Sequence, residues 1–273
     1  MKVLVTGADG YLASGVIRRL LEEGCDVVGF GLGPTPEIHS DHFLYKRGNS
    51  FDLGVDGLVR VAPDAVLHLA WRNGFKHGDS CHIDDLPGHY RFVCDCVAAH
   101  VPRLAIMGSM HEVGYHEGAV NANTACSPTT PYAIAKNALR QLAFGECSNS
   151  DTSLLWMRGF YIVSADGRGD SIFAKIITAE REGKDKFPFT SGKSKYDFID
   201  YPDFCSQVAK VVRDGRSAGI VNICSGRPES LASRVERFIR ENGLKISLEY
   251  GAFPDRPYDS PEIFGEPMGH KEP

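Results

Sequence analysis

Short apolar runs alternate with amphipathic stretches over the first 160 residues of the chain. The apolar runs are rich in β-branched residues and have the length of buried strands, which are expected at residues 2–6, 26–30, 65–70, 104–108 and 153–157. The amphipathic stretches have the length of helices, which are expected at residues 11–23, 55–61, 84–100 and 131–144. This alternation predicts an α/β fold built on a doubly wound parallel sheet.

The pattern becomes looser after residue 160. Helices are expected at residues 171–182, 203–212 and 230–241, strands at 219–224 and 246–250, a loop at 166–170, and a hairpin or loop in the polar stretch 183–195. The sequence therefore predicts a main domain over residues 1–160, to which residues 197–224 return. Residues 161–196 and 225–273 are expected to form a small C-terminal lobe.

Composition excludes several classes of function. The chain has 273 residues, 42% of them hydrophobic and 24% charged, which is ordinary for a globular domain with a modest extra lobe. A net charge of −5 argues against a general nucleic-acid binder, and no apolar run approaches the ~18 residues of a membrane helix. No secretion signal is recognised, so we expect a cytoplasmic protein whose eight cysteines are reduced thiols.

One group of cysteines and histidines invites a metal interpretation. Cys81-His82 and Cys94-Asp95-Cys96 are close in sequence to three further histidines, His77, His89 and His100. The pair Cys94 and Cys96 falls on different faces of the expected helix, and the sequence has no CxxC pair. We therefore expect no metal site.

A glycine-rich turn lies between the first strand and the first helix. Gly7 permits a tight turn, Gly10 lets the backbone approach a pyrophosphate, and Ala13 keeps helix and strand close. The helix N-terminus then faces the phosphates with its amides and positive dipole end. The turn predicts a dinucleotide site in the main domain, with contacts from Gly7, Asp9, Gly10, Tyr11 and Leu12.

The choice of dinucleotide depends on the second strand. NAD sites usually place an acid at its end to hold the ribose hydroxyls, but this strand ends Val27-Val28-Gly29-Phe30-Gly31. Lys46 and Arg47 follow the next apolar run and could meet a 2′-phosphate, which favours NADP over NAD. Asn49 or Asp52 is placed to contact the adenine, unless either only caps a turn.

Tyr132 and Lys136 are the strongest candidates for catalysis. Their i, i+4 spacing puts the phenol and the ammonium on one face of a helix that Pro131 can begin. There the lysine can favour the phenolate, so that the tyrosine gives or takes a proton near neutral pH. With the dinucleotide site, the pair predicts hydride chemistry on an alcohol or ketone.

These motifs together resemble the extended short-chain dehydrogenase/reductases, the NAD(P)-dependent epimerase/dehydratase group that acts mostly on nucleotide-linked sugars. Besides the glycine turn and the Tyr132-xxx-Lys136 pair, three stretches are similar to family motifs: residues 68–71 (His-Leu-Ala-Trp), 196–204 and 221–226. The resemblance spans nearly the whole chain and implies a Rossmann-like fold with a substrate-binding C-terminal lobe. It also implies that Leu69, Ala70 and Trp71 contact the cofactor.

The resemblance implies roles for the catalytic side chains. Tyr132 acts as acid and base, Lys136 holds the nicotinamide ribose and lowers the tyrosine pKa, and a Ser or Thr binds the substrate oxygen. Alignment puts Met110 at that hydroxyl position, and a thioether cannot donate a hydrogen bond. Either Ser109, one residue earlier, takes the role, which we favour, or His111 substitutes.

Two further departures bear on the reaction and the substrate. Dehydratases of the family carry an acidic pair after the hydroxyl, but here it is His111-Glu112, which argues against 4,6-dehydration while keeping Glu112 as a catalytic candidate. Tyr196 stands where relatives have an arginine. Met110, His111, Tyr196 and the possible anion ligands Arg72 and Arg256 complete the predicted substrate contacts.

The leading interpretation is an NAD(P)-dependent reductase of a 4-keto-6-deoxy sugar nucleotide. The alternatives are a 4-epimerase with tightly bound NAD, a sugar-nucleotide dehydratase, and a non-catalytic dinucleotide sensor. The resemblance implies a homodimer, formed through the helix that carries Tyr132 and the helix before the fifth strand. Neither nucleic acid nor membrane is expected as a partner.

Overall fold

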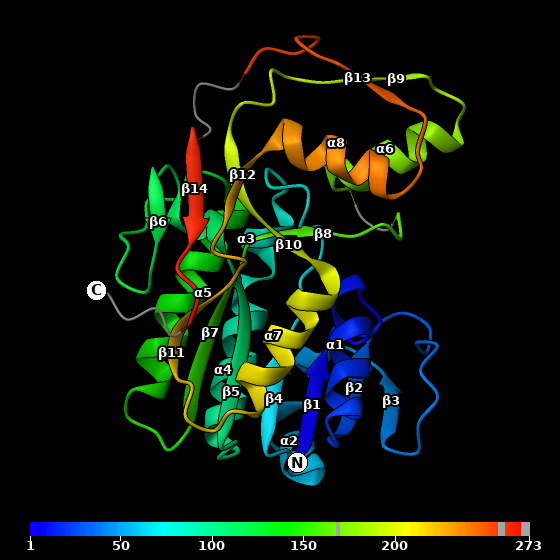
Figure 1. Cartoon of the computed structure of the whole chain (residues 1–273). Helices are drawn as coiled ribbons and strands as arrows, with labels where there is room; N and C mark the ends of the chain where they lie inside the picture. The colour runs from blue at the N-terminus through cyan, green and yellow to red at the C-terminus, as the bar shows by residue number, and fades with distance from the viewer. Residues whose placement is uncertain (168–169, 256–259, 269–273) are drawn as a thin grey trace. The chain divides into compact units, whose positions relative to one another are not determined.

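The computed structural model describes residues 1–167, 170–255 and 260–268, and the chain divides into two compact units (Figure 1). Unit 1 comprises Met1–Gly114, Ala125–Gly159 and Pro202–Val221, and unit 2 comprises Tyr115–Thr124, Phe160–Tyr201 and Asn222–Pro273. Both units are therefore assembled from segments far apart in sequence. The roles expected for the main domain and the C-terminal lobe stay predictions.

A seven-stranded sheet forms the centre of unit 1. Its strand order is β11-β7-β5-β4-β1-β2-β3. The pairings β1–β2, β1–β4, β2–β3, β4–β5 and β5–β7 are all parallel. The strands are β1 (Lys2–Thr6), β2 (Asp26–Gly31), β3 (Phe43–Arg47), β4 (Ala65–His68), β5 (Arg103–Ser109), β7 (Ser153–Gly159) and β11 (Gly219–Ile223). The predicted doubly wound parallel sheet is confirmed.

Helices cover both faces of this sheet because its strands are apolar on both sides. On one face, α2 (Gly54–Val61), α4 (Leu86–Ala98) and α5 (Pro131–Cys147) bury a cluster that includes Leu58, Phe92, Leu139 and Trp156. On the other face lie α1 (Tyr11–Glu22) and α7 (Tyr201–Arg213), whose ends are joined by an ion pair of 2.6 Å between Arg213 and Glu23 (Figure 1).

Two predicted boundaries differ from the structure. The single helix expected over residues 84–100 is two helices, α3 (Cys81–Asp84) and α4, because Pro87 lacks an N–H and starts a new helix in its first turn. The strand expected to reach residue 70 ends at His68, because the amide of Ala70 donates to the Thr6 hydroxyl at 3.2 Å instead of joining the ladder. This bond holds the end of β4 beside the end of β1.

Unit 2 contains a second sheet that the sequence pattern predicts poorly. Its order is β12-β10-β14-β6, with β8 also paired to β10, and a separate pair joins β13 to β9. The elements are β6 (Gly118–Val120), β8 (Tyr161–Val163), α6 (Ile172–Arg181), β9 (Lys186–Pro188), β10 (Lys195–Asp200), β12 (Pro228–Ser230), α8 (Leu231–Glu241), β13 (Ser247–Glu249) and β14 (Glu262–Gly265). Strands of three or four residues carry too little alternation to be recognised without their partners.

No helix in the described residues has both the length and the apolar character needed to cross a membrane. Nor do three or more of their histidine, cysteine, aspartate or glutamate side chains gather as a metal-binding group.

Candidate functional site

The glycine turn between β1 and α1 is compact and depends on its glycines. Gly7 has a φ of 64°, and a Cβ there would lie 2.8 Å from the Ala70 Cα. A Cβ on Gly10 would lie 2.9 Å from the Gly7 carbonyl oxygen, and Gly10 is the N-cap of α1 without a side-chain cap. A side chain at either position would collide with the backbone of the protein itself, so this tight turn requires both glycines. A glycine turn of this kind before a helix N-terminus fits the pyrophosphate of a dinucleotide.

This turn lies where the strand order of the sheet reverses. β1 has β2 on one side and β4 on the other, and the loops after β1 and β4 therefore leave the same edge in opposite directions. Buried hydrogen bonds join these strand ends to α4: Thr6 Oγ1 lies 2.7 Å from His68 Nδ1, and His68 Nε2 lies 2.9 Å from His89 Nδ1. Burial lowers the pKa of both histidines, that of His89 to about 3, so both imidazoles are uncharged at neutral pH.

Helix α5 carries the Tyr132 and Lys136 pair. Thr130 caps the helix by accepting a hydrogen bond from the Ala133 amide at 3.3 Å, which fixes the first turn. The buried Lys136 Nζ donates to the Met107 carbonyl oxygen at 2.7 Å and lies 3.7 Å from the centre of the Trp71 ring. The same nitrogen is 6.0 Å from the centre of the Tyr132 ring, so the two side chains share one face as predicted from their spacing.

The direction of the tyrosine pKa corrects the sequence-based expectation. Burial raises the pKa of Tyr132 to about 12, and the nearby Glu112 charge adds to this, while a hydrogen bond with Ser109 opposes it. Burial also lowers the pKa of Lys136 to about 7. The lysine does not shift the tyrosine downward here because its own charge is suppressed by burial.

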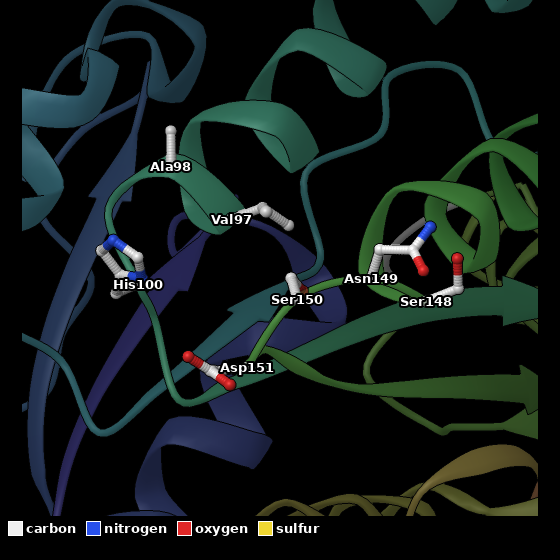
Figure 2. A pocket seen from close by; sticks show the side chains of 7 residues that line it. All are labelled: Val97, Ala98, His100, Ser148, Asn149, Ser150 and Asp151. Atoms are coloured by element: carbon white, nitrogen blue, oxygen red, sulfur yellow. The ribbon is translucent and has the colours of Figure 1, made fainter.

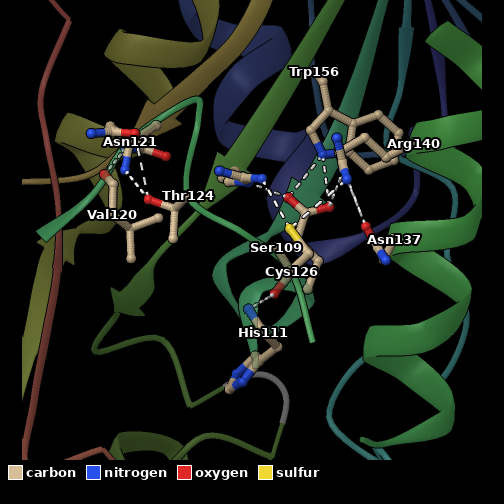
Figure 3. A network of polar contacts seen from close by, with 12 residues as sticks. Ser109, His111, Val120, Asn121, Thr124, Cys126, Asn137, Arg140 and Trp156 are labelled. Carbon is tan, nitrogen blue, oxygen red and sulfur yellow. Dashed lines mark hydrogen bonds and ion pairs between the residues drawn. The ribbon is translucent and has the colours of Figure 1, made fainter. Parts of the chain in front are cut away.

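Ser109 supplies a hydroxyl that interacts with Tyr132. It ends β5 and accepts a hydrogen bond from the His111 amide at 3.2 Å, which starts the 3₁₀ turn η2 (Met110–Val113) (Figure 3). Its hydroxyl lowers the pKa of Tyr132 against the larger effect of burial, while Met110 is buried. Between the two alternatives considered for the missing Ser or Thr, the geometry favours Ser109.

Two histidines lie beside the tyrosine: His111, which the sequence suggested for the site, and His77, which it did not. The His77 ring is stacked on the Tyr132 ring at 4.7 Å and 7°, and the His77 carbonyl accepts the Tyr132 amide at 3.0 Å. His111 contacts His77 edge-on at 4.4 Å, and burial together with His77 lowers the pKa of His111 to about 3. His77 belongs to the loop between β4 and α3, and no spacing in the sequence connects it to a tyrosine 55 positions away.

Glu112 lies in a buried ion-pair network between η2 and β7. Its carboxylate accepts from Arg158 Nε at 2.6 Å and from Trp156 Nε1 at 3.0 Å to each oxygen, and Arg140 Nε lies 3.8 Å away (Figure 3). Both Glu112 and Arg158 have fully buried side chains. These contacts occupy the carboxylate that was predicted to be catalytic, so its geometry fits a positioning role better than proton transfer.

Two further predicted substrate contacts make interactions within their own units. Arg72 follows β4 and forms a bidentate ion pair with Asp85, with Nη2 donating to Oδ1 at 2.9 Å. Tyr196 lies in unit 2, where it is buried in β10 with its ring 4.7 Å from that of Tyr161. Arg256 is outside the described residues.

The end of β2, where the ribose-binding acid is missing, is also structured. Asp9 Oδ2 accepts from the Gly33 amide at 2.6 Å, and Tyr45 Oη donates to the Gly33 carbonyl at 2.8 Å. Arg47 Nε donates to the Leu32 carbonyl at 3.0 Å. Asn49 caps the 3₁₀ turn η1 (Ser50–Asp52) by accepting from the Phe51 amide at 3.1 Å, which is the turn-capping alternative considered for this residue.

A separate hollow lies at the opposite edge of the sheet (Figure 2). It is formed by the loops between α4 and β5 and between α5 and β7, and its lining residues are Val97, Ala98, His100, Ser148, Asn149, Ser150 and Asp151. Both loops precede the amino ends of their strands, whereas Ser109 and the glycine turn follow carboxyl ends. The hollow is therefore not part of the site built around Tyr132.

Comparison with known proteins agrees with this geometry. The model of the NAD dependent epimerase/dehydratase family matches residues 3–224. The dTDP-6-deoxy-L-talose 4-dehydrogenase (NAD(+)) of Aggregatibacter actinomycetemcomitans is 39% identical over 271 residues, covering 97% of this chain and 99% of the relative. The UDP-glucose 4-epimerase of Mycolicibacterium smegmatis is 27% identical, with coverage of 97% and 88%.

Solved structures share the fold. MoeE5 in complex with UDP-glucose and NAD superposes with a TM-score of 0.80 at 24% identity, covering 98% of this chain and 90% of that one. The Bordetella bronchiseptica enzyme WbmH in complex with NAD+ gives a TM-score of 0.81 at 21% identity, with coverage of 97% and 89%. The resemblance inferred from the motifs is confirmed, and the chain belongs to the NAD dependent epimerase/dehydratase family.

Proposed function

We propose that this protein is an NAD-dependent oxidoreductase that interconverts the ketone and the alcohol at C4 of a 6-deoxyhexose linked to a nucleoside diphosphate. The observation that carries the proposal is that Tyr132 and the buried Lys136 share one face of α5, with Lys136 Nζ 6.0 Å from the centre of the Tyr132 ring. The sugar class rests on the 39% identical 4-dehydrogenase, whose length this chain matches almost completely.

The side chains have distinct roles in this proposal. A bound nicotinamide dinucleotide supplies or accepts the hydride at C4. Tyr132 donates a proton to the ketone oxygen during reduction, and its raised pKa keeps the phenol protonated at neutral pH. Ser109 holds the same oxygen, and Lys136 orients the nicotinamide ribose.

The cofactor proposed is NAD, in place of the NADP favoured by the sequence. The relative's name specifies NAD(+), and the exposed Asp9 carboxylate lies at the end of β2. The turn residues Gly7 and Gly10 are proposed to hold the pyrophosphate. Asp52 near the adenine stays a prediction.

The experiment is an absorbance assay of NADH at 340 nm, run in the oxidative and in the reductive direction. Purified protein is mixed with dTDP-6-deoxy-L-talose and NAD+, or with the corresponding 4-keto sugar nucleotide and NADH. We expect stoichiometric change in NADH, a product that differs from the substrate by two hydrogens in mass, and a loss of roughly 10² or more in turnover for Tyr132→Phe, since only the proton donor is removed. Near-normal turnover in Tyr132→Phe would reassign the acid.

A 4-epimerase is the second candidate because relatives at 23% and 27% identity carry that name. An epimerase uses the same residues but returns the hydride, so it would interconvert sugar epimers without net change in NADH. The assay separates the two outcomes. The homodimer and the cytoplasmic location stay predictions.

A further inference from the structure

We propose that Asp9, in the glycine turn, supplies the ribose-binding carboxylate that β2 lacks, and so selects NAD over NADP. This inference rests on the proposed function, since it concerns the same dinucleotide site. It assigns the selectivity to a residue of the first loop rather than to the end of the second strand.

The Asp9 carboxylate occupies the space beside Gly31 and Gly33. β2 ends at the buried Gly31, at the strand end where an acid would ordinarily project. A Cβ added at Gly31 would collide with Asp9 Oδ1, and one added at Gly33 would lie 2.5 Å from Asp9 Oδ2. The carboxylate of Asp9 therefore fills the space that a side chain at the strand end would take. The two glycines make room for an acid that arrives from the neighbouring loop.

The Asp9 carboxylate is also held in place and remains accessible. Its Oδ2 accepts from the Gly33 amide at 2.6 Å, which leaves Oδ1 to accept from a ribose hydroxyl. Asp9 is an exposed residue. Its negative charge also acts on its surroundings, because burial and the charge of Asp9 together raise the pKa of Tyr45.

The charge of Asp9 acts more strongly than that of the nearby Arg47 on the pKa of Tyr45. Arg47 Nε donates to the Leu32 carbonyl at 3.0 Å, and Lys46 Nζ lies 6.0 Å from the centre of the Phe30 ring. The Asp9 carboxylate lies at the end of β2, where it accepts from the Gly33 amide. A 2′-phosphate brought there would meet a like charge, whereas a ribose diol would donate hydrogen bonds to it.

The test measures binding rather than turnover. Dissociation constants of NAD and NADP are determined by isothermal titration calorimetry for the wild type, Asp9→Ala and Asp9→Asn, with Asp56→Asn as a control that removes an exposed charge from α2. We expect the wild type to prefer NAD, and Asp9→Ala to lose about tenfold or more of its NAD affinity, the contribution of a charge-assisted hydrogen bond. Asp9→Asn keeps an acceptor for the Gly33 amide but not the charge, so its NADP affinity should rise relative to NAD. The control should match the wild type.

A double variant guards against a merely structural effect. Asp9→Ala combined with Gly31→Asp moves the acid to the strand end, where the space left by the Asp9 carboxylate is bounded by the Tyr45 hydroxyl 2.9 Å from the new Cβ. Once the end of the Tyr45 side chain shifts, the preference for NAD should be restored. An unchanged ratio of the two dissociation constants in all Asp9 variants, or a wild type that prefers NADP, would overturn the inference. Selective NAD binding without turnover of any 6-deoxyhexose nucleotide would instead overturn the proposed function alone.

Discussion

At the scale of single residues, Lys136 shows how burial changes a familiar motif. Its ammonium is held by one backbone carbonyl and the face of Trp71, and both contacts are weaker than the hydration it loses. Burial therefore lowers its pKa to about 7 and leaves the pKa of Tyr132 raised to about 12. The acid and base chemistry predicted from the spacing depends on this environment rather than on the spacing alone.

The lowered pKa of Lys136 predicts how stability depends on pH. Between about pH 7 and pH 10 the unfolded chain binds a proton at this lysine that the folded protein has released, so the free energy of unfolding should rise with pH. The contribution should approach about 1.4 kcal/mol per pH unit, and Lys136→Met should lack it. Urea unfolding at pH 6, 7, 8 and 9 measures the difference between the two proteins.

A control and a contradicting outcome are available for this prediction. Lys210→Met removes an exposed lysine from α7 and should keep the slope of the wild type. If the unfolding free energies of Lys136→Met and wild type ran parallel over this pH range, the ammonium would not be desolvated as the structure indicates.

At the scale of elements, the Glu112 network joins the 3₁₀ turn η2 to strand β7. Ser109 and His111 belong to or border this turn, so the position of the serine hydroxyl depends on how the turn is anchored. Arg158 and Glu112 are both fully buried and form an ion pair with each other, and Arg140 lies 3.8 Å from the same carboxylate. A sequence comparison that assigns Glu112 to catalysis has no means of detecting this partner in β7.

The ion pair predicts a large loss of stability in Glu112→Gln. The amide still fits the site and can accept from Trp156, but it leaves the buried Arg158 charge uncompensated, at a cost of about 3–5 kcal/mol. Thermal and urea unfolding measure this loss. Glu182→Gln is the matched control, because it breaks an exposed ion pair with Lys184 that is worth roughly 0–1 kcal/mol. Equal stability of the two variants would show that Arg158 does not rely on Glu112.

At the scale of the whole molecule, the exposed side of α5 suggests that the protein forms a dimer. Helices α4 and α5 pack beside each other on one face of the unit 1 sheet. Two large apolar side chains of α5, Ile134 and Leu142, are 43% and 39% exposed. Eight positions separate them, which places them on one side of the helix, as expected for a surface that a second copy would cover.

We therefore expect a dimer that depends on this side of α5. Light scattering after size-exclusion chromatography should give twice the 29.9 kDa of one chain, and Leu142→Glu should shift the mass toward that of the monomer, because a charge would be buried in the contact. Val59→Glu changes an equally apolar exposed side chain on α2 and should leave the mass unchanged. A monomeric wild type at micromolar concentration would contradict the expectation.

The sequence by itself determined the parallel sheet of unit 1, the glycine turn and the shared face of Tyr132 and Lys136. These features depend on periodicity and on residues a few positions apart, which local sequence carries. The short strands of unit 2, the stacking of His77 on Tyr132, the burial that sets the pKa values and the Glu112 pair with Arg158 were decided only by the tertiary structure. They join segments tens of residues apart, and desolvation depends on what covers a group, so neither can be read from local pattern. The placement of Asp9 at Gly31 belongs with them, because a missing acid in one strand is recognised as replaced only when the neighbouring loop is seen beside it.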